Sequence, residues 1–142
     1  MINIETGQIT FNNRLIVDSK MDFSELNRNT KDFEKEYSDL KNGWEWLRLR
    51  NIKTDKTDYF VSIAFYNKKI AMIEFGIEKN YAEWNLESEN ERKKEHDLWL
   101  SKTIGQNRIF SWGKIESEFD KKAGYSSIVI NYNRLKTGGN NV

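Results

Sequence analysis

Residues 84–105 read WNLESENERKKEHDLWLSKTIG, and residues 108–132 continue as RIFSWGKIESEFDKKAGYSSIVINY. The first segment predicts a long helix, because Asn85 is a favourable N-cap, Gly105 can end a helix with a positive φ, and no proline interrupts the run. The second segment predicts two strands, because apolar and polar residues alternate in both of its halves. A helix that leads directly into two strands indicates an α+β fold.

The predicted helix is uneven along its length. Residues 87–97 contain no apolar side chain, whereas Leu98, Trp99, Leu100 and Ile104 crowd its last turns. This pattern predicts a helix that is anchored at its C-terminal end and solvated over its first turns. His96, which is the single histidine of the chain, is therefore expected to be exposed.

Strand signals dominate the remainder of the chain. Residues 59–66 and 69–77, on either side of Asn67-Lys68, each place alternate apolar side chains on one face, which predicts a central antiparallel hairpin. Residues 108–119 predict one further strand, and after a turn from Lys121 to Gly124 the residues Ile128, Ile130 and Tyr132 mark the last one. Residues 2–12 predict a short hairpin that turns at Thr6-Gly7.

Two short helical segments are expected near the N-terminus. Asp22 and Glu25 have the spacing of a capping box, which predicts a helical turn after Asp22. Thr30 is a candidate cap for a second segment, in which Phe33, Tyr37 and Leu40 fall on one helical face.

The expected architecture is therefore α+β. It has a mainly antiparallel sheet of about five or six strands, one long helix packed across a face, and one or two short N-terminal helices. Residues 1–135 are expected to form a single domain, because a chain of 142 residues suits one hydrophobic core. The small polar residues 136–142 are expected to be a disordered tail.

Composition excludes several classes of function. The chain has no cysteine, which excludes disulfides and thiolate metal sites, and its net charge of +1 argues against binding driven by gross charge. The first residues lack the pattern of a signal peptide, and no apolar run approaches the roughly 20 residues of a membrane span. We therefore expect a cytoplasmic protein that needs no membrane, metal or cofactor.

Few residues suggest catalysis. With one histidine and no cysteine, the chain lacks the usual ligands of a zinc site, and no glycine-rich phosphate loop is present. Glu116, Glu118 and Asp120 are spaced by two, so on a strand they would share a face and could act in acid–base chemistry. A small carboxylate-dependent enzyme is therefore one alternative, although such acidic residues usually face solvent.

Residues 44–50 provide the candidate for a binding surface, since Trp44, Trp46, Arg48 and Arg50 would share one face of a strand. Trp and Arg are prominent in interface hot spots, and the same side chains could stack on nucleobases and contact phosphates. The competing interpretation places both tryptophans in the core and the arginines at the sheet edge, because alternating apolar residues usually mark the buried side.

The C-terminal third of the chain resembles a known class of proteins. The run from Trp112-Gly113 through Ile115, Phe119-Asp120, Gly124 and Ile128 to Tyr132, preceded by a charged helix ending in His96-Asp97-Leu98-Trp99-Leu100, is similar to small bacterial proteins encoded beside polymorphic or contact-dependent toxins. The resemblance implies an immunity protein, which binds and blocks a cognate toxin. It assigns no role to individual residues and implies no particular architecture.

The first expectation for function is thus a non-catalytic binding protein that neutralises a toxin. Its contacts are expected either on the strand with Trp44, Trp46, Arg48 and Arg50, or on the acidic side chains of the long helix, which are Glu87, Glu91, Glu95 and Asp97. The alternatives are the carboxylate-dependent enzyme and a single-stranded nucleic-acid-binding module. The near-neutral net charge makes nucleic-acid binding the less favoured of these functions.

Overall fold

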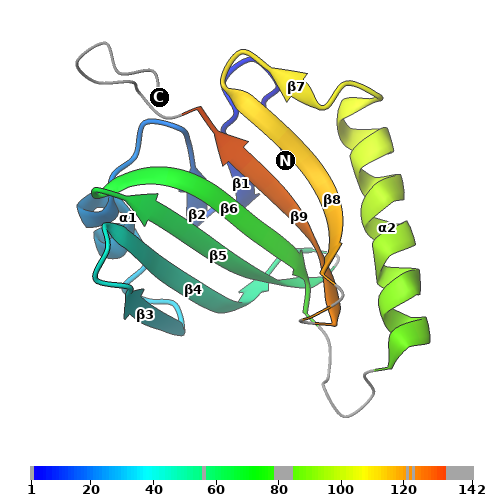
Figure 1. Ribbon diagram of the computed structural model, residues 1–142, viewed down its shortest axis with the longest axis horizontal. Coiled ribbons are helices and arrows are strands. Elements are labelled where there is room, and N and C mark those ends of the chain that lie inside the picture. The colour runs from blue at the N-terminus through cyan, green and yellow to red at the C-terminus, as the bar shows by residue number, and fades with distance from the viewer. Residues whose placement is uncertain (1, 56, 79–84, 121, 123, 134–142) are drawn as a thin grey trace.

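The computed structural model describes residues 2–55, 57–78, 85–120, 122 and 124–133 (Figure 1). In chain order the elements are β1 (Ile9–Asn12), β2 (Leu15–Val17), α1 (Phe23–Asn29), β3 (Lys35–Asp39), β4 (Trp44–Lys53), β5 (Asp58–Tyr66), β6 (Lys69–Ile77), α2 (Leu86–Ile104), β7 (Ile109–Phe110), β8 (Gly113–Asp120) and β9 (Tyr125–Tyr132). The fold is α+β, as predicted. Its main sheet has seven antiparallel strands in the order β3-β4-β5-β6-β9-β8-β7, and β1 and β2 form a separate pair.

Hydrogen bonds and backbone angles confirm two predicted helix caps, the end of the long helix and one predicted hairpin turn. A side-chain oxygen of Asp22 accepts a hydrogen bond from the Glu25 amide at 2.9 Å, and one of Asn85 accepts from the Ser88 amide at 2.8 Å. The long helix ends at Gly105, whose φ is 78°. Asn67 and Lys68 make the turn between β5 and β6, and both have the positive φ that a tight hairpin turn requires.

The main sheet is larger than predicted, partly because residues 35–39 form a strand. The predicted helical face of Phe33, Tyr37 and Leu40 is therefore wrong. β3 pairs with β4 along its whole length, from Lys35 opposite Leu49 to Asp39 opposite Glu45. The Tyr37 hydroxyl also donates to the buried carboxylate of Glu45, so long-range pairing overrides the local helical spacing.

Two further predictions need correction. The segment 108–119 is not one strand but the tight β7–β8 hairpin, in which Phe110 pairs with Gly113. Of the hairpin predicted over residues 2–12, the second half forms β1, but among the described residues the first half contributes a single bridge, between Ile2 and Ile9. The predicted tail 136–142 lies outside the described residues.

The hydrophobic core lies on one face of the main sheet. That face carries Leu47, Leu49, Val61, Ile63, Phe65, Ile73, Phe75, Ile115, Ile128 and Ile130. The hairpin β1–β2 and α1 cover it, contributing Ile9, Leu15, Val17 and Leu26, and they lie behind the sheet in Figure 1. Trp99 of α2 also packs on this face, with its ring centroid 5.8 Å from that of Phe75.

The main sheet divides at one point, where β6 and β9 separate. The two strands pair only from Met72 opposite Asn131 to Phe75 opposite Ile128. Continuing this register would place Ile77 opposite Ser126, but both of these amides donate instead to side chains of α2. The Ser126 amide donates to Glu89 at 3.0 Å, and the Ile77 amide donates to Nε2 of His96 at a long 3.5 Å. We call this place the fork.

The fork explains why one polar stripe of α2 is buried. Glu89, Arg92 and His96 are only 0%, 7% and 2% exposed, so the prediction of an exposed histidine is wrong. The predicted solvation of the first turns holds for the other side of the helix, where Glu87, Glu91 and Glu95 are exposed. Arg92 forms an ion pair with Glu89 at 3.2 Å, which compensates the buried carboxylate. A polar helix face is buried here because it meets backbone amides that no strand satisfies.

Leu100 and Leu98 test how α2 is anchored. Leu100 is 1% exposed and Leu98 is 56% exposed, although they lie two residues apart on the same helix. We expect Leu100→Ala to lower the free energy of unfolding by about 2–5 kcal/mol, since it removes core contacts. Leu98→Ala should change it by less than about 0.5 kcal/mol. Equal effects in urea unfolding would contradict the packing described here.

Candidate binding face and fork pocket

The face of the main sheet opposite the core is the outer face. Neither α1, α2 nor the β1–β2 hairpin is drawn in front of it in Figure 1. The strand register aligns its side chains in rows. One row runs Trp46, Ala64, Met72, Asn131 and Lys114, and the next runs Arg48, Ser62, Glu74, Val129 and Glu116. The outer face thus combines aromatic, basic and acidic side chains.

The predicted grouping of Trp44, Trp46 and Arg48 on one side of β4 is confirmed, and this side is the outer face. The interpretation that both tryptophans are core is wrong, because Leu47 and Leu49 occupy the buried side and leave the tryptophans half-buried. The Trp44 and Tyr66 rings lie 5.1 Å apart, and the Arg48 guanidinium lies 5.2 Å from the Trp46 ring centroid.

Arg50 lies further along β4, next to an irregularity in the sheet. The β4–β5 register shifts between Leu49 and Ile52, and Asn51 has a φ of 56°. The Arg50 side chain is 45% exposed and forms an ion pair with Glu78 at 2.7 Å. Arg50 therefore contacts the end of β6 at the fork, and it lines the same pocket as Arg48.

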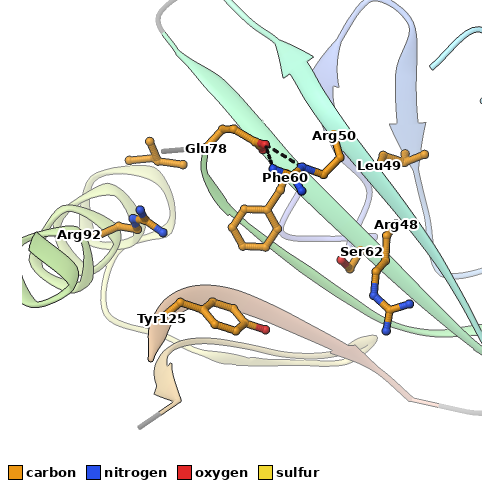
Figure 2. A pocket seen from close by; sticks show the side chains of 9 residues that line it. Arg48, Leu49, Arg50, Phe60, Ser62, Glu78, Arg92 and Tyr125 are labelled. Atoms are coloured by element: carbon orange, nitrogen blue, oxygen red, sulfur yellow. Dashed lines mark hydrogen bonds and ion pairs between the residues drawn. The ribbon is translucent and has the colours of Figure 1, made fainter. Parts of the chain in front are cut away.

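A pocket of about 230 Å³ opens on the outer side of the fork, and we call it the fork pocket (Figure 2). Five separate parts of the chain contribute to its lining: Arg48 and Arg50 from β4, Phe60 and Ser62 from β5, Glu78 from the end of β6, Arg92 from α2 and Tyr125 from β9. Figure 2 shows Arg92 projecting from the helix toward Phe60 and Tyr125. The separation of β6 from β9 thus brings the buried helix face into contact with the outer face.

Two features keep the fork pocket open. Gly76 lies beside it, and a Cβ at this position would come within 2.8 Å of the Phe60 ring and 3.2 Å of the His96 ring. The Phe60 and Tyr125 rings meet at 79° with their centroids 6.1 Å apart, so they stand as two walls and do not stack over the opening.

An acidic area adjoins the fork pocket. The Glu74 carboxylate accepts from the Tyr125 hydroxyl at 3.1 Å and from the Ser127 hydroxyl at 2.8 Å. Burial and the charges of Glu116 and Glu74 raise the pKa of Glu118. Glu116, Glu118 and Asp120 share the outer face, as predicted from their spacing, but none of them lines the fork pocket.

The acidic candidates on α2 lie apart from this pocket. Glu87, Glu91, Glu95 and Asp97 are all exposed, and none of them lines the fork pocket. Asp97 forms an ion pair with Lys93 at 2.8 Å. The structure therefore presents two separate candidate surfaces, the exposed side of α2 and the outer face with its fork pocket.

Sequence reasoning missed Arg92, Phe60, Glu78 and Tyr125 as members of one site. A signal for Arg92 exists, because Glu89, Arg92, His96 and Leu100 follow a helical spacing of three, four and four residues. That stripe is polar except for Leu100, so a search for apolar periodicity passes over it.

Neither a metal site, a membrane-spanning helix nor a family match adds to this geometry in the described part of the chain. No group of three or more His, Asp or Glu side chains suited to a metal ion is found among the described residues. Neither α1 nor α2, the helices of the described part of the chain, has the length and apolar character needed to span a membrane. No family model matches the chain, and comparisons with curated proteins and with solved structures find no match.

The Tyr125 hydroxyl provides a test of the outer-face geometry. Burial and the Glu74 carboxylate raise the pKa of Tyr125 to about 12, from an ordinary value of 10.0. Because the neutral phenol is favoured in the folded protein, its contribution to stability is present below pH 10 and is lost as the pH rises through about 12.

We expect Glu74→Gln to lower the pKa of Tyr125, since it removes the charge that opposes ionisation. The measurement is a ¹³C NMR titration of tyrosine-labelled protein. Glu91→Gln, which removes one negative charge from the exposed side of α2, is the control and should leave the titration unchanged. A Tyr125 titration that responds equally to both variants would contradict the contact with Glu74.

Proposed function

We propose that this protein is a non-catalytic binding protein, and specifically a cytoplasmic immunity protein that binds and neutralises a cognate toxin through its outer face. The observation that carries the proposal is the composition of that face. Half-buried Trp44, Trp46 and Tyr66 lie beside Arg48 on adjacent strands, and Trp, Tyr and Arg are the residues that most often dominate binding energy in interfaces.

The shape and charge of the outer face also support a protein partner. A stable interface needs about 800 Å² on each side, which an uncovered multistranded sheet face can supply. Basic Arg48 and acidic Glu74 lie in the same row across β4, β5 and β6, so a partner with complementary charges would be oriented as well as held. The resemblance of the C-terminal third to immunity proteins directs this proposal toward a toxin.

The two alternatives receive less support. Nucleic-acid phosphates on the outer face would meet Glu74, Glu116 and Glu118, which opposes the attraction of Arg48. An enzyme would be expected to place its carboxylates in a recess, whereas Glu116, Glu118 and Asp120 lie outside the fork pocket.

The exposed side of α2, with Glu87, Glu91, Glu95 and Asp97, is the competing interface. It offers charge, but it lacks the aromatic side chains that bury area with little loss of side-chain freedom. We therefore place the main contacts on the outer face and treat the α2 side as peripheral.

The test is binding to the toxin encoded by the neighbouring gene, measured by isothermal titration with a catalytically inactive form of that toxin. We expect Trp46→Ala to weaken binding by about 30-fold or more, as a hot-spot residue does. The double variant Glu91→Lys with Glu95→Lys should change the dissociation constant by less than about tenfold, because peripheral charges act mainly on the association rate.

Melting temperatures of both variants must stay within a few degrees of the wild type, so that loss of binding is not loss of folding. A strong effect of the helix variant with none of Trp46→Ala would move the interface to α2. Failure of the neighbouring toxin to bind the wild-type protein would remove the proposed function.

A further inference from the structure

The charged side chains that line the fork pocket do not balance one another. Three guanidinium groups and one carboxylate line it, and Arg50 and Glu78 neutralise each other at 2.7 Å. Arg48 donates to the Ser38 hydroxyl at 3.0 Å and lies over the Trp46 ring, but it forms no ion pair among the described residues. The pocket is thus positively charged on the side of Arg48.

Arg92 contributes a buried hydrogen-bond donor beside this pocket. Its side chain is 8% exposed, and its ion pair with Glu89 uses one terminal nitrogen. Its Nε, which is buried, has no hydrogen-bond partner within the described part of the chain. A buried N–H without an acceptor costs about as much as a lost hydrogen bond, so an acceptor that entered the pocket would gain a strong, charge-assisted bond.

The size and walls of the pocket limit what can enter. A volume of about 230 Å³ is below the roughly 300–1,000 Å³ of typical small-molecule sites, and is better matched to one inserted side chain. The Phe60 and Tyr125 rings form apolar walls, and Ser62 lies at the strand position opposite Arg48. An occupant with a short apolar stem and an anionic end suits the apolar walls and the positive charge of this lining.

We propose that the fork pocket receives an acidic side chain, Asp or Glu, of the partner protein. The positive charges of the Arg92 and Arg48 guanidinium groups attract the carboxylate, and the methylene stem lies between the two rings. This inference rests on the proposed function and deepens it, because it assigns one charged anchor of the toxin to one pocket of the outer face.

Two variants and one control test the partner contact. Arg48→Gln removes the uncompensated charge, and Ser62→Leu fills the pocket without changing charge. Each should weaken toxin binding by about 30-fold or more. Arg14→Gln removes an exposed arginine whose side chain is 61% exposed and pairs with Asp32, so it should change affinity by less than about fivefold.

The pocket is also tested without any toxin, by NMR of ¹⁵N-labelled protein. The probes are N-acetylglutamate N-methylamide and the uncharged N-acetylglutamine N-methylamide. We expect the glutamate probe to shift the Arg92 Nε–H resonance saturably, with a dissociation constant of about 1–10 mM, and the glutamine probe to leave it in place. Arg48→Gln should abolish the shift and Arg14→Gln should retain it.

The outcomes separate the two proposals. No shift with the glutamate probe, or an equal shift with both probes, overturns the carboxylate site. A shift in the wild type together with unchanged toxin affinity of Arg48→Gln and Ser62→Leu removes the pocket from the interface while the proposed function stands. A wild-type protein that binds no toxin removes the proposed function, and with it the pocket's role in partner binding.

Discussion

Two backbone amides, those of Ile77 and Ser126, set the arrangement of this fold. They belong to strands that pair up to Phe75 and Ile128 and then separate, so each donates to a side chain of α2 and not to another strand. An unsatisfied buried amide costs about 1–3 kcal/mol, which is a large share of the stability of a small domain. The helix must therefore bring Glu89 and His96 to this place, and Arg92 comes with them because it compensates the buried charge of Glu89.

The same constraint links the fold to the candidate site. Without the fork, a continuous sheet would separate α2 from the outer face. With it, Arg92 reaches the pocket that β4, β5 and β9 also line, and residues as distant in sequence as Arg48 and Tyr125 become neighbours. Gly76 keeps the space between the Phe60 and His96 rings free of a side chain. The candidate pocket thus lies where the main sheet divides, and departures from regular structure are expected at functional sites.

Local rules were sufficient for part of this structure. The caps at Asp22 and Asn85 and the turn at Asn67-Lys68 depend on groups only a few residues apart, and the sequence predicts them correctly. β3 could not be predicted, because its pairing with β4 is a long-range interaction that competes with a local helical pattern. The buried side of β4 could not be decided from the sequence, since leucine and tryptophan alternate there and both are apolar. The burial of His96 depends on an amide of β6, which no spacing within the helix reveals.

Amide hydrogen exchange at Ser126 tests most directly whether α2 holds the fork. In Glu89→Ala the Ser126 amide loses its acceptor, so it should exchange faster by about tenfold or more relative to the Ile130 amide, which lies within the β6–β9 pairing. In Glu91→Ala, whose side chain is 61% exposed, the ratio of the two rates should stay as in the wild type. If Ser126 keeps its protection relative to Ile130 in Glu89→Ala, the helix does not hold the fork and the structural basis of the pocket is wrong.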